Sequence, residues 1–95
     1  MAYKVNILME AQADIEDAVE WYEGKSAGLG RRFLDDLFNQ LRYLSHYPEH
    51  FPQKKNALRE VNLKSFPYLV IYEFEQEEIT VWAVFNTWQN PLKKP

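Results

Sequence analysis

Two runs of strand-forming residues near the carboxyl end constrain the fold of this chain more than any other feature. Residues 68–74 and 79–85 are rich in Val, Ile, Tyr, Phe and Trp, side chains that suit a pleated, half-buried surface. The short polar segment 75–78 separates them, so the two runs are expected to form neighbouring strands of one sheet. The polar residues 86–90 follow the second run directly, and we first look for a functional site at this strand end.

The composition limits the chain to one small domain. Its 95 residues leave room for one core, so we treat 1–95 as a single domain with a flexible tail at 91–95. A hydrophobic content of 46% argues against disorder. The absence of cysteine excludes disulfides and thiolate chemistry and fits a reducing cytoplasm. The longest apolar run, 68–72, is too short to cross a membrane.

The charge of the chain does not favour nucleic acid as a general partner. The formal net charge is −3, and residues 10–23 hold six acidic side chains. Basic residues gather in the middle of the chain, where only Glu60 interrupts Lys54, Lys55, Arg59 and Lys64. This asymmetry predicts a local patch that could face an anion.

The first half of the chain predicts a strand and two helices. Residues 3–8 alternate apolar and polar side chains, as a half-buried strand does. Apolar residues then recur along one helical face, with acidic residues on the opposite, solvated side. The residues of that apolar face are Ala11, Ile15, Ala18, Val19 and Tyr22. All three glycines lie in 24–30, which predicts a turn into a second helix.

The second predicted helix begins near residue 29 or 30 and ends at Tyr47, before Pro48 and Pro52. Its apolar stripe is wider than that of the first helix and consists of Phe33, Leu34, Leu37, Phe38, Leu41 and Leu44. Two such helices joined by a short turn form an antiparallel hairpin, and each needs a sheet face to cover.

The second half predicts three strands, at 57–63, 68–74 and 79–85. In the last of them, simple alternation places Ile79, Val81, Ala83 and Phe85 on one face, opposite Thr80, Trp82 and Val84. The order β-α-α-β-β-β predicts an α+β fold in which a helical hairpin packs on one side of a mostly antiparallel sheet.

Motifs in this order resemble the RelE/ParE family of small bacterial toxins from type II toxin–antitoxin systems. The resemblance covers nearly the whole chain. Its marks are Ala11, Asp14-Ile15, Trp21-Tyr22-Glu23, Gly28-Leu29-Gly30, Phe33, Tyr47-Pro48, Phe51, Arg59, Phe66-Pro67-Tyr68, Ile71-Tyr72 and the closing segment from Val84 to Pro91. It implies the fold predicted above, a cytoplasmic growth inhibitor of the kind that stabilises plasmids, and an antitoxin encoded beside it that wraps and blocks it.

The resemblance leaves two targets open. RelE-like members cleave messenger RNA in the ribosomal A site without a metal, whereas ParE-like members inhibit DNA gyrase. RNA cleavage needs an acid, a base and cations around the phosphate. Arg59 matches the strand arginine of the family and suits a phosphate, and Lys54 and Lys55 lie roughly where RelE-like enzymes carry basic residues. The alternative for Arg59 is an ion pair with Glu73, Glu75 or the antitoxin.

The closing motif departs from the pattern of a nuclease. The common form of the family is Val-Phe-His-Thr-Ser-Arg-Asn-Pro, whereas this chain has Asn86 for the histidine and Gln89 for the arginine. Neither amide exchanges a proton near neutral pH or carries a charge. Trp88 replaces a small residue and is expected to cover the site, or to pack on the helices or a partner. We expect His46 and His50 to be polar loop residues, and His46 to contact the helix end.

Three hypotheses follow. The first is a ParE-like or catalytically weakened toxin that acts by binding a protein and is neutralised by its cognate antitoxin. The second is a ribosome-dependent mRNA endonuclease that uses Arg59, Lys54 and Lys55. The third is a non-toxic relic kept for antitoxin binding. None of the three calls for a metal or cofactor, and we expect no membrane association and no direct DNA binding without the antitoxin.

Overall fold

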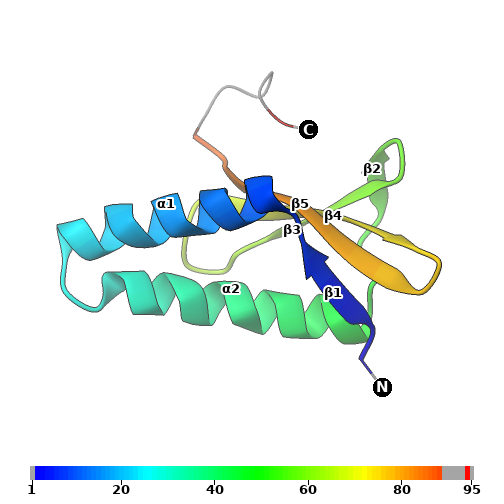
Figure 1. Cartoon of the computed structure of the whole chain (residues 1–95), viewed down its shortest axis with the longest axis horizontal. Coiled ribbons are helices and arrows are strands. Elements are labelled where there is room, and N and C mark those ends of the chain that lie inside the picture. Colours follow the sequence, from blue (N-terminus) through cyan, green and yellow to red (C-terminus); the bar gives the residue numbers. More distant parts are fainter. Residues whose placement is uncertain (1, 89–93, 95) are drawn as a thin grey trace.

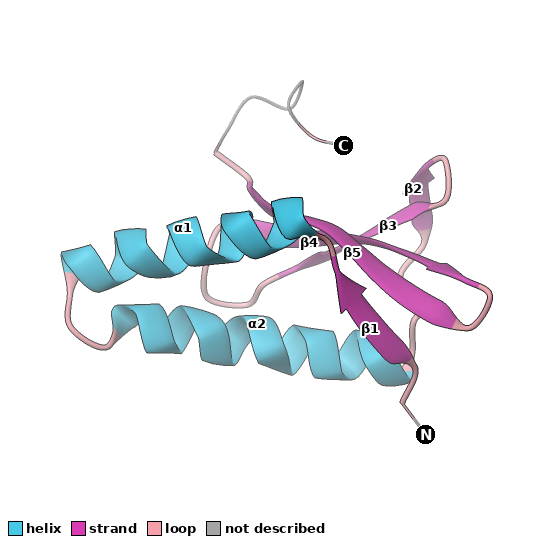
Figure 2. Ribbon diagram, viewed as in Figure 1, coloured by secondary structure: helices cyan, strands magenta, loops and turns pink. Residues whose placement is uncertain are grey.

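The protein folds into a five-stranded sheet with two helices packed against it (Figures 1 and 2). The structure is a computed structural model and describes residues 2–88 and 94. The elements are β1 (Lys4–Ile7), α1 (Met9–Lys25), α2 (Leu29–His46), β2 (Gln53–Lys55), β3 (Leu58–Asn62), β4 (Tyr68–Glu75) and β5 (Glu78–Asn86). The strand order is β1-β5-β4-β3-β2, in which only the β1–β5 pair is parallel. The predicted α+β class, with its mostly antiparallel sheet, is confirmed. Apart from Lys94, the predicted tail at 91–95 lies outside the described residues.

One strand, β2, was not predicted. It pairs with β3 across a turn at Asn56, whose backbone φ is 55°. Three polar residues carry no strand pattern of their own, so the sequence alone does not indicate a strand here. The hairpin with β3 supplies the pairing that the local sequence does not indicate. Lys54 and Lys55 therefore belong to an edge strand.

The two helices lie antiparallel and bury one side each, as predicted (Figure 1). In α1 the buried side chains are Ala11, Ile15 and Ala18. In α2 the apolar stripe is wider than the area that the sheet and α1 cover. Phe33, Leu37 and Leu44 are fully buried, whereas Phe38, which belongs to the same predicted stripe, is 50% exposed. Within the described residues, neither helix is long and apolar enough to span a bilayer.

The acidic residue Glu23 at the end of α1 caps the start of α2. Its carboxylate accepts hydrogen bonds from the backbone N–H of Gly28, at 2.9 Å to Oε2, and from that of Gly30, at 3.0 Å to Oε1. Both bonds lower the pKa of Glu23, and the bond from Gly28 has the larger effect. The first turn of α2 holds no acidic residue of its own, so α1 supplies the negative charge that a helix start favours.

A bulge in β5 changes which residues face the helices. Ile71 pairs with Ala83 but Tyr72 pairs with Val81, so Trp82 has no partner on β4. Because side chains alternate along a strand, one extra residue reverses the faces beyond it. The predicted sharing of one face by Ile79, Val81, Ala83 and Phe85 is therefore wrong.

The bulge gives the sheet two apolar clusters, one on each side. Toward the helices, Ile79, Val81 and Val84 join the main core. On the other side, Ala83 and Phe85 are buried with Ile71 of β4, and Leu58 and Leu69 pack at the edge of this group. Trp82 itself, at the bulge, donates from its indole Nε1 to Glu73 Oε1 at 2.9 Å.

Close packing between the helices predicts opposite effects of alanine at two glycines. A Cβ on Gly30 would lie 2.9 Å from the carbonyl oxygen of Val19, whereas a Cβ on Gly24 meets nothing within 4 Å. Gly30→Ala should lower the free energy of unfolding by roughly 1–3 kcal/mol through overpacking. Gly24→Ala, in the last turn of α1, should raise it by about 0.5–1 kcal/mol. Urea unfolding followed by circular dichroism measures both, and equal effects would contradict the close approach.

Candidate functional site

Arg59 lies beneath the loop that follows α2. It is two residues from the buried Val61 on β3, so its side chain is on the helix-facing side of the sheet. Its Nη1 donates to the carbonyl oxygen of Phe51 and lies 3.5 Å from that of Glu49. Its Nε is buried, and no described residue accepts a hydrogen bond from it. The guanidinium thus holds the loop in place.

Tyr72 completes this arrangement. It is the partner of Arg59 on β4, is fully buried, and donates from its hydroxyl to the carbonyl oxygen of Pro48 at 2.7 Å. Burial raises the pKa of Tyr72 to about 12, although the Arg59 charge acts in the opposite direction. The carboxylates considered as partners of Arg59 do not take that role in the described structure: the ion pairs there are Arg31–Asp35 and Glu60–Lys94.

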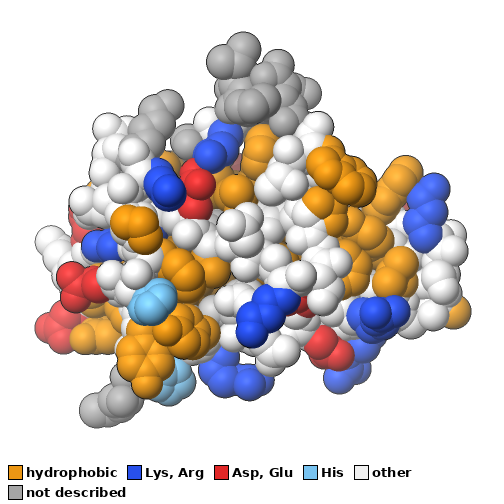
Figure 3. Space-filling view, turned by 180° about the vertical axis from the view of Figure 1, so that it is seen from behind, with side chains coloured by type: hydrophobic (Ala, Val, Ile, Leu, Met, Phe, Trp, Pro, Cys, Tyr) orange, Lys and Arg blue, Asp and Glu red, His pale blue; other side chains and the backbone are white. Residues whose placement is uncertain are grey.

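The other predicted cations lie on β2, next to β3. Gln53 pairs with Arg59, and Lys55 pairs with Leu58. The Lys54 side chain is exposed at this sheet edge. The pairing brings the two lysines and Arg59 onto one hairpin. On the face in Figure 3, lysine and arginine side chains are scattered among other side chains and do not form one continuous patch.

The polar segment after β5 is occupied with contacts inside the fold. Asn86 Oδ1 accepts from the Trp88 backbone N–H at 2.8 Å, and Asn86 Nδ2 lies 3.4 Å from the Tyr68 hydroxyl. The backbone N–H and the hydroxyl of Thr87 both donate to the carbonyl oxygen of Pro67, at 2.8 and 2.9 Å. These bonds tie the end of β5 to the start of β4. Gln89 lies outside the described residues, and the Trp88 side chain is 81% exposed.

Arg59 and Asn86 lie at different positions along the sheet. Arg59 pairs with Tyr72 on β4, whereas Asn86 pairs with Tyr68 of the same strand. Four residues of a strand span about 13 Å, at about 3.3 Å per residue. The fold therefore does not bring Arg59, the predicted phosphate-binding residue, close to Asn86 in the closing motif.

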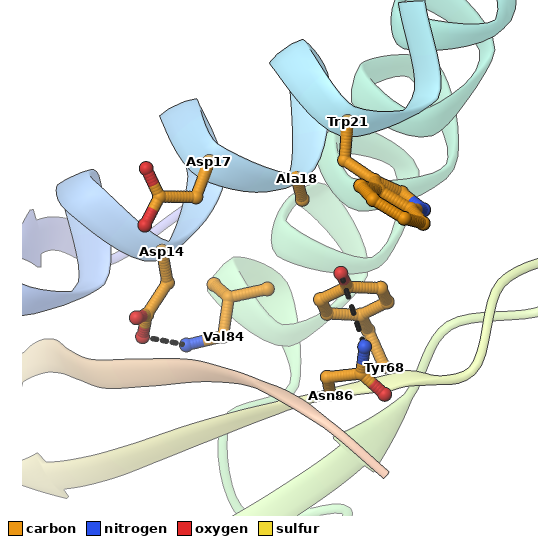
Figure 4. Close-up of a pocket in the computed structure, with 7 residues that line it drawn as sticks. All are labelled: Asp14, Asp17, Ala18, Trp21, Tyr68, Val84 and Asn86. Atoms are coloured by element: carbon orange, nitrogen blue, oxygen red, sulfur yellow. Dashed lines mark hydrogen bonds between the residues drawn. The ribbon is translucent and has the colours of Figure 1, made fainter. Parts of the chain in front are cut away.

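A pocket of about 390 Å³ does open at the strand end (Figure 4). Its lining residues come from α1, β4 and β5 and are Asp14, Asp17, Ala18, Trp21, Tyr68, Val84 and Asn86. In Figure 4 the indole of Trp21 extends from α1 toward Tyr68 and Asn86, and Asp14 reaches down to Val84. The pocket thus combines two carboxylates with an aromatic ring, a hydroxyl and an amide. The pocket opens at the end of β5, the strand end at which the sequence directed the search for a site.

The surroundings of the Asp14 carboxylate shift its pKa. Its Oδ2 accepts from the backbone N–H of Val84 at 3.0 Å, which joins α1 to β5. Burial raises the pKa of Asp14, the bond from Val84 opposes this rise, and the charges of Asp17 and Glu10 add to it. A carboxylate held beside other carboxylates in this way favours a cation nearby.

Asp14 and Trp21 are marks of the family resemblance, but they were not predicted to belong to a site. A signal was present, because Asp14, Asp17 and Trp21 recur at i, i+3 and i+7 and so share one side of a helix. That side lies at the margin of the apolar face. Only the fold shows that the end of β5 lies opposite it.

The two histidines lie away from this pocket, beside an aromatic group near the end of α2. His46 Nδ1 bonds the carbonyl oxygen of Arg42 at 2.9 Å, so its predicted contact with the helix end is confirmed. His50 packs edge-on against Tyr43 and Phe51. In Figure 3 both pale-blue histidines border an orange hydrophobic area. Among the described residues, no three His, Asp or Glu side chains gather in a group that could hold a metal ion.

Tyr72→Phe tests the structural role of the Arg59–Tyr72 pair. The change leaves the Pro48 carbonyl without its donor and should lower the free energy of unfolding by about 1–2 kcal/mol. The pKa of Tyr72 is about 10 unfolded and about 12 folded, so its contribution is complete below pH 10 and is lost as the pH rises toward 12. The variant should therefore lose less stability than the parent between pH 10 and 12. Tyr47→Phe, at an exposed ring, is the control and should change neither quantity.

Asp14 offers a second test, in which two substitutions should change the free energy of unfolding in opposite directions. The raised pKa of Asp14 means that its contribution to stability falls as the pH rises from the unfolded value of 3.8 through the folded value. At pH 7 Asp14→Asn should therefore raise stability, because the amide oxygen still accepts from Val84 without the charge. Asp14→Ala should lower it by about 1–2 kcal/mol, since the Val84 N–H loses its acceptor. Denaturant unfolding at pH 4 and pH 7 measures both, and Glu16→Gln is the control for removing one charge from α1.

Comparison with known proteins places this fold in a family. Residues 5–91 match the family model described as "ParE toxin of type II toxin-antitoxin system, parDE". No curated protein matches the chain. A chain of the solved structure titled "Chromosomal ParDE TA system from P. aeruginosa" is similar, with a TM-score of 0.76 and 16% sequence identity. The similarity covers 90% of this chain and 96% of that one, and at this identity it shows the fold.

The match narrows the predicted resemblance from the wider RelE/ParE group to its ParE part. It begins within β1 and continues past the end of β5, so it includes every helix and nearly every residue of the sheet. This chain belongs to the ParE toxin family of type II toxin–antitoxin systems.

Proposed function

We propose that this protein arrests growth in the cytoplasm by binding a protein target, not by cleaving RNA, and that a cognate antitoxin encoded beside it neutralises it by binding. The target implied by the ParE resemblance is DNA gyrase. Family membership supports the role of toxin. The choice of binding over catalysis depends on the features of this chain.

The observation that carries the proposal is the exposure of all three tryptophans. Trp21 is 59% exposed, Trp82 39% and Trp88 81%. Tryptophan is enriched in the residues that dominate protein–protein binding energy, because its large ring excludes water and also donates a hydrogen bond. A domain of this size gains stability by burying such rings, so leaving all three exposed favours surfaces that a partner covers.

The groups needed for metal-free RNA cleavage are engaged elsewhere or far apart. Arg59 donates to the backbone of the loop after α2, and Asn86 uses its amide to close the turn after β5. About 13 Å of strand separates their positions along β4. The geometry therefore supports a binding protein better than an endonuclease built on Arg59, Lys54 and Lys55.

The solved ParDE structure, by its title, is a toxin–antitoxin system. We extend this to the present chain as a proposal: its partner is the product of an adjacent reading frame. Such a partner would cover exposed aromatic side chains of the toxin and so prevent them from reaching the target.

Induction of this chain alone in a bacterial host should stop growth, and DNA synthesis should fall before protein synthesis does. Co-expression of the adjacent reading frame should restore growth, and the two proteins should elute together in size-exclusion chromatography. Labelled thymidine and labelled methionine incorporation, followed in parallel, separate the two syntheses. A chain terminated at Phe33, which lacks four of the five strands and most of α2, is the inactive control.

Three results would contradict the proposal. Primer extension that reveals cuts at ribosomal A sites, lost in Arg59→Ala, would favour the nuclease. Unaffected growth despite abundant folded protein would favour a non-toxic chain retained for antitoxin binding. Failure of both adjacent reading frames to form a complex would remove the proposed neutralisation.

A further inference from the structure

The pocket at the end of β5 holds acidic groups that no described cation neutralises. Asp14 and Asp17 both line it, and they are neighbours at i, i+3 on α1. Within residues 2–88 and at Lys94, the ion pairs are Arg31–Asp35 and Glu60–Lys94, and neither reaches the pocket. One oxygen of Asp14 accepts a hydrogen bond from the Val84 N–H, and the charge of Asp17 raises the pKa of Asp14 further. The pocket therefore gains from a positive charge that the described part of the chain does not supply.

The field around the pocket also favours a cation. Residues 10–23 contain six acidic side chains and no lysine or arginine. All of them lie on α1, whose outward side borders the pocket. A concentration of one charge sign beside a cleft attracts the opposite sign and speeds the approach of a charged partner.

Trp21 gives the other end of the pocket an aromatic wall (Figure 4). Its indole, like Asp17, lines this pocket and also a neighbouring cavity that includes Lys25. The Lys25 Nζ is 4.2 Å from the centre of the ring, which shows that the indole already receives a cation in that cavity. Lys25 is not among the residues of the pocket at the end of β5.

The remaining lining residues indicate which shape of ligand fits the pocket. Ala18 and Val84 supply apolar surface for an aliphatic stem, and the Tyr68 hydroxyl and Asn86 lie at the end of the pocket. An arginine side chain matches this set, because its stem is apolar and its planar head bonds more than one carboxylate through several N–H groups. A lysine ammonium carries the charge but lacks this planar fork of donors.

We propose that this pocket binds the side chain of an arginine presented by a partner protein, with the guanidinium at the Asp14 and Asp17 carboxylates and the aliphatic stem along Ala18 and Val84 toward the Trp21 indole (Figure 4). The inference rests on the proposed function, in that it names a chemical feature of the protein that this toxin binds. A partner segment that enters here would be basic, in keeping with the acidic outward side of α1.

The test is a titration of the isotopically labelled chain with N-acetyl-arginine amide, observed by two-dimensional NMR. The expected result is a saturable shift of the Trp21 indole N–H and of the Val84 amide signal. N-acetyl-citrulline amide, which has nearly the same shape without the charge, should cause no saturable shift. N-acetyl-lysine amide should bind more weakly than the arginine compound.

Two matched variants locate the binding. Asp17→Asn removes a charge inside the pocket and should weaken arginine binding by about tenfold, as expected for losing a charge-assisted hydrogen bond. Glu16→Gln removes a charge from an exposed position of α1 that does not line the pocket, and should change binding by less than about twofold. The NMR spectrum of each variant shows directly that it remains folded.

Several outcomes would overturn the inference. They are equal binding of arginine and citrulline, equal binding of arginine and lysine, equal weakening by the two variants, and absence of a saturable shift. The result is independent of the growth and complex assays. An arginine site in a chain that neither arrests growth nor binds an adjacent product would contradict only the proposed function. A toxin with a partner but without this binding would contradict only the inference.

Discussion

The one-residue bulge at Trp82 determines where the functional groups of the sheet lie. Before it, Ile79 and Val81 face the helices, and after it Val84 and Asn86 do so. Without the extra residue, strict alternation would turn Val84 and Asn86 to the opposite side of the sheet. The pocket beside α1 would then lose its floor and its amide. A local irregularity in one strand is thus the condition for a pocket that α1, β4 and β5 line together.

The sequence predicted the elements whose buried faces produce a long, regular pattern of apolar residues. The apolar stripe of α2 and the strands β4 and β5 each extend over eight or more residues, so their periods are clear. The bulge could not be predicted, because it depends on how β5 pairs with β4, which the pattern of one strand does not contain. The edge strand β2 has three polar residues, and only its pairing with β3 makes it a strand. The cap at Glu23 depends on a contact between two helices, which no single-helix pattern contains.

The sequence singled out two residues for opposite reasons. Arg59 has a guanidinium that suits a phosphate, whereas Asn86 stands where the common form of the family has a histidine. The fold uses both for its own backbone: Arg59 holds the loop after α2, and Asn86 closes the turn after β5. The type of a side chain indicates what it can bind, but its neighbours decide whether its bonds remain available. Asp17 illustrates the reverse case, because its carboxylate lines a pocket and forms no ion pair with any described residue.

Asp14 connects the stability of the sheet to the pocket. The parallel strand β1 pairs with β5 only as far as Val81, so the following part of β5 has an edge without a neighbouring strand. An exposed edge invites pairing with another chain. Asp14 accepts the Val84 N–H at this edge, although burial and neighbouring acids disfavour its charge. A cation in the pocket would lower that electrostatic cost while leaving the bond to Val84 intact. Binding of an arginine should therefore also hold α1 more firmly against the end of β5, which couples occupation of the pocket to closure of the sheet edge.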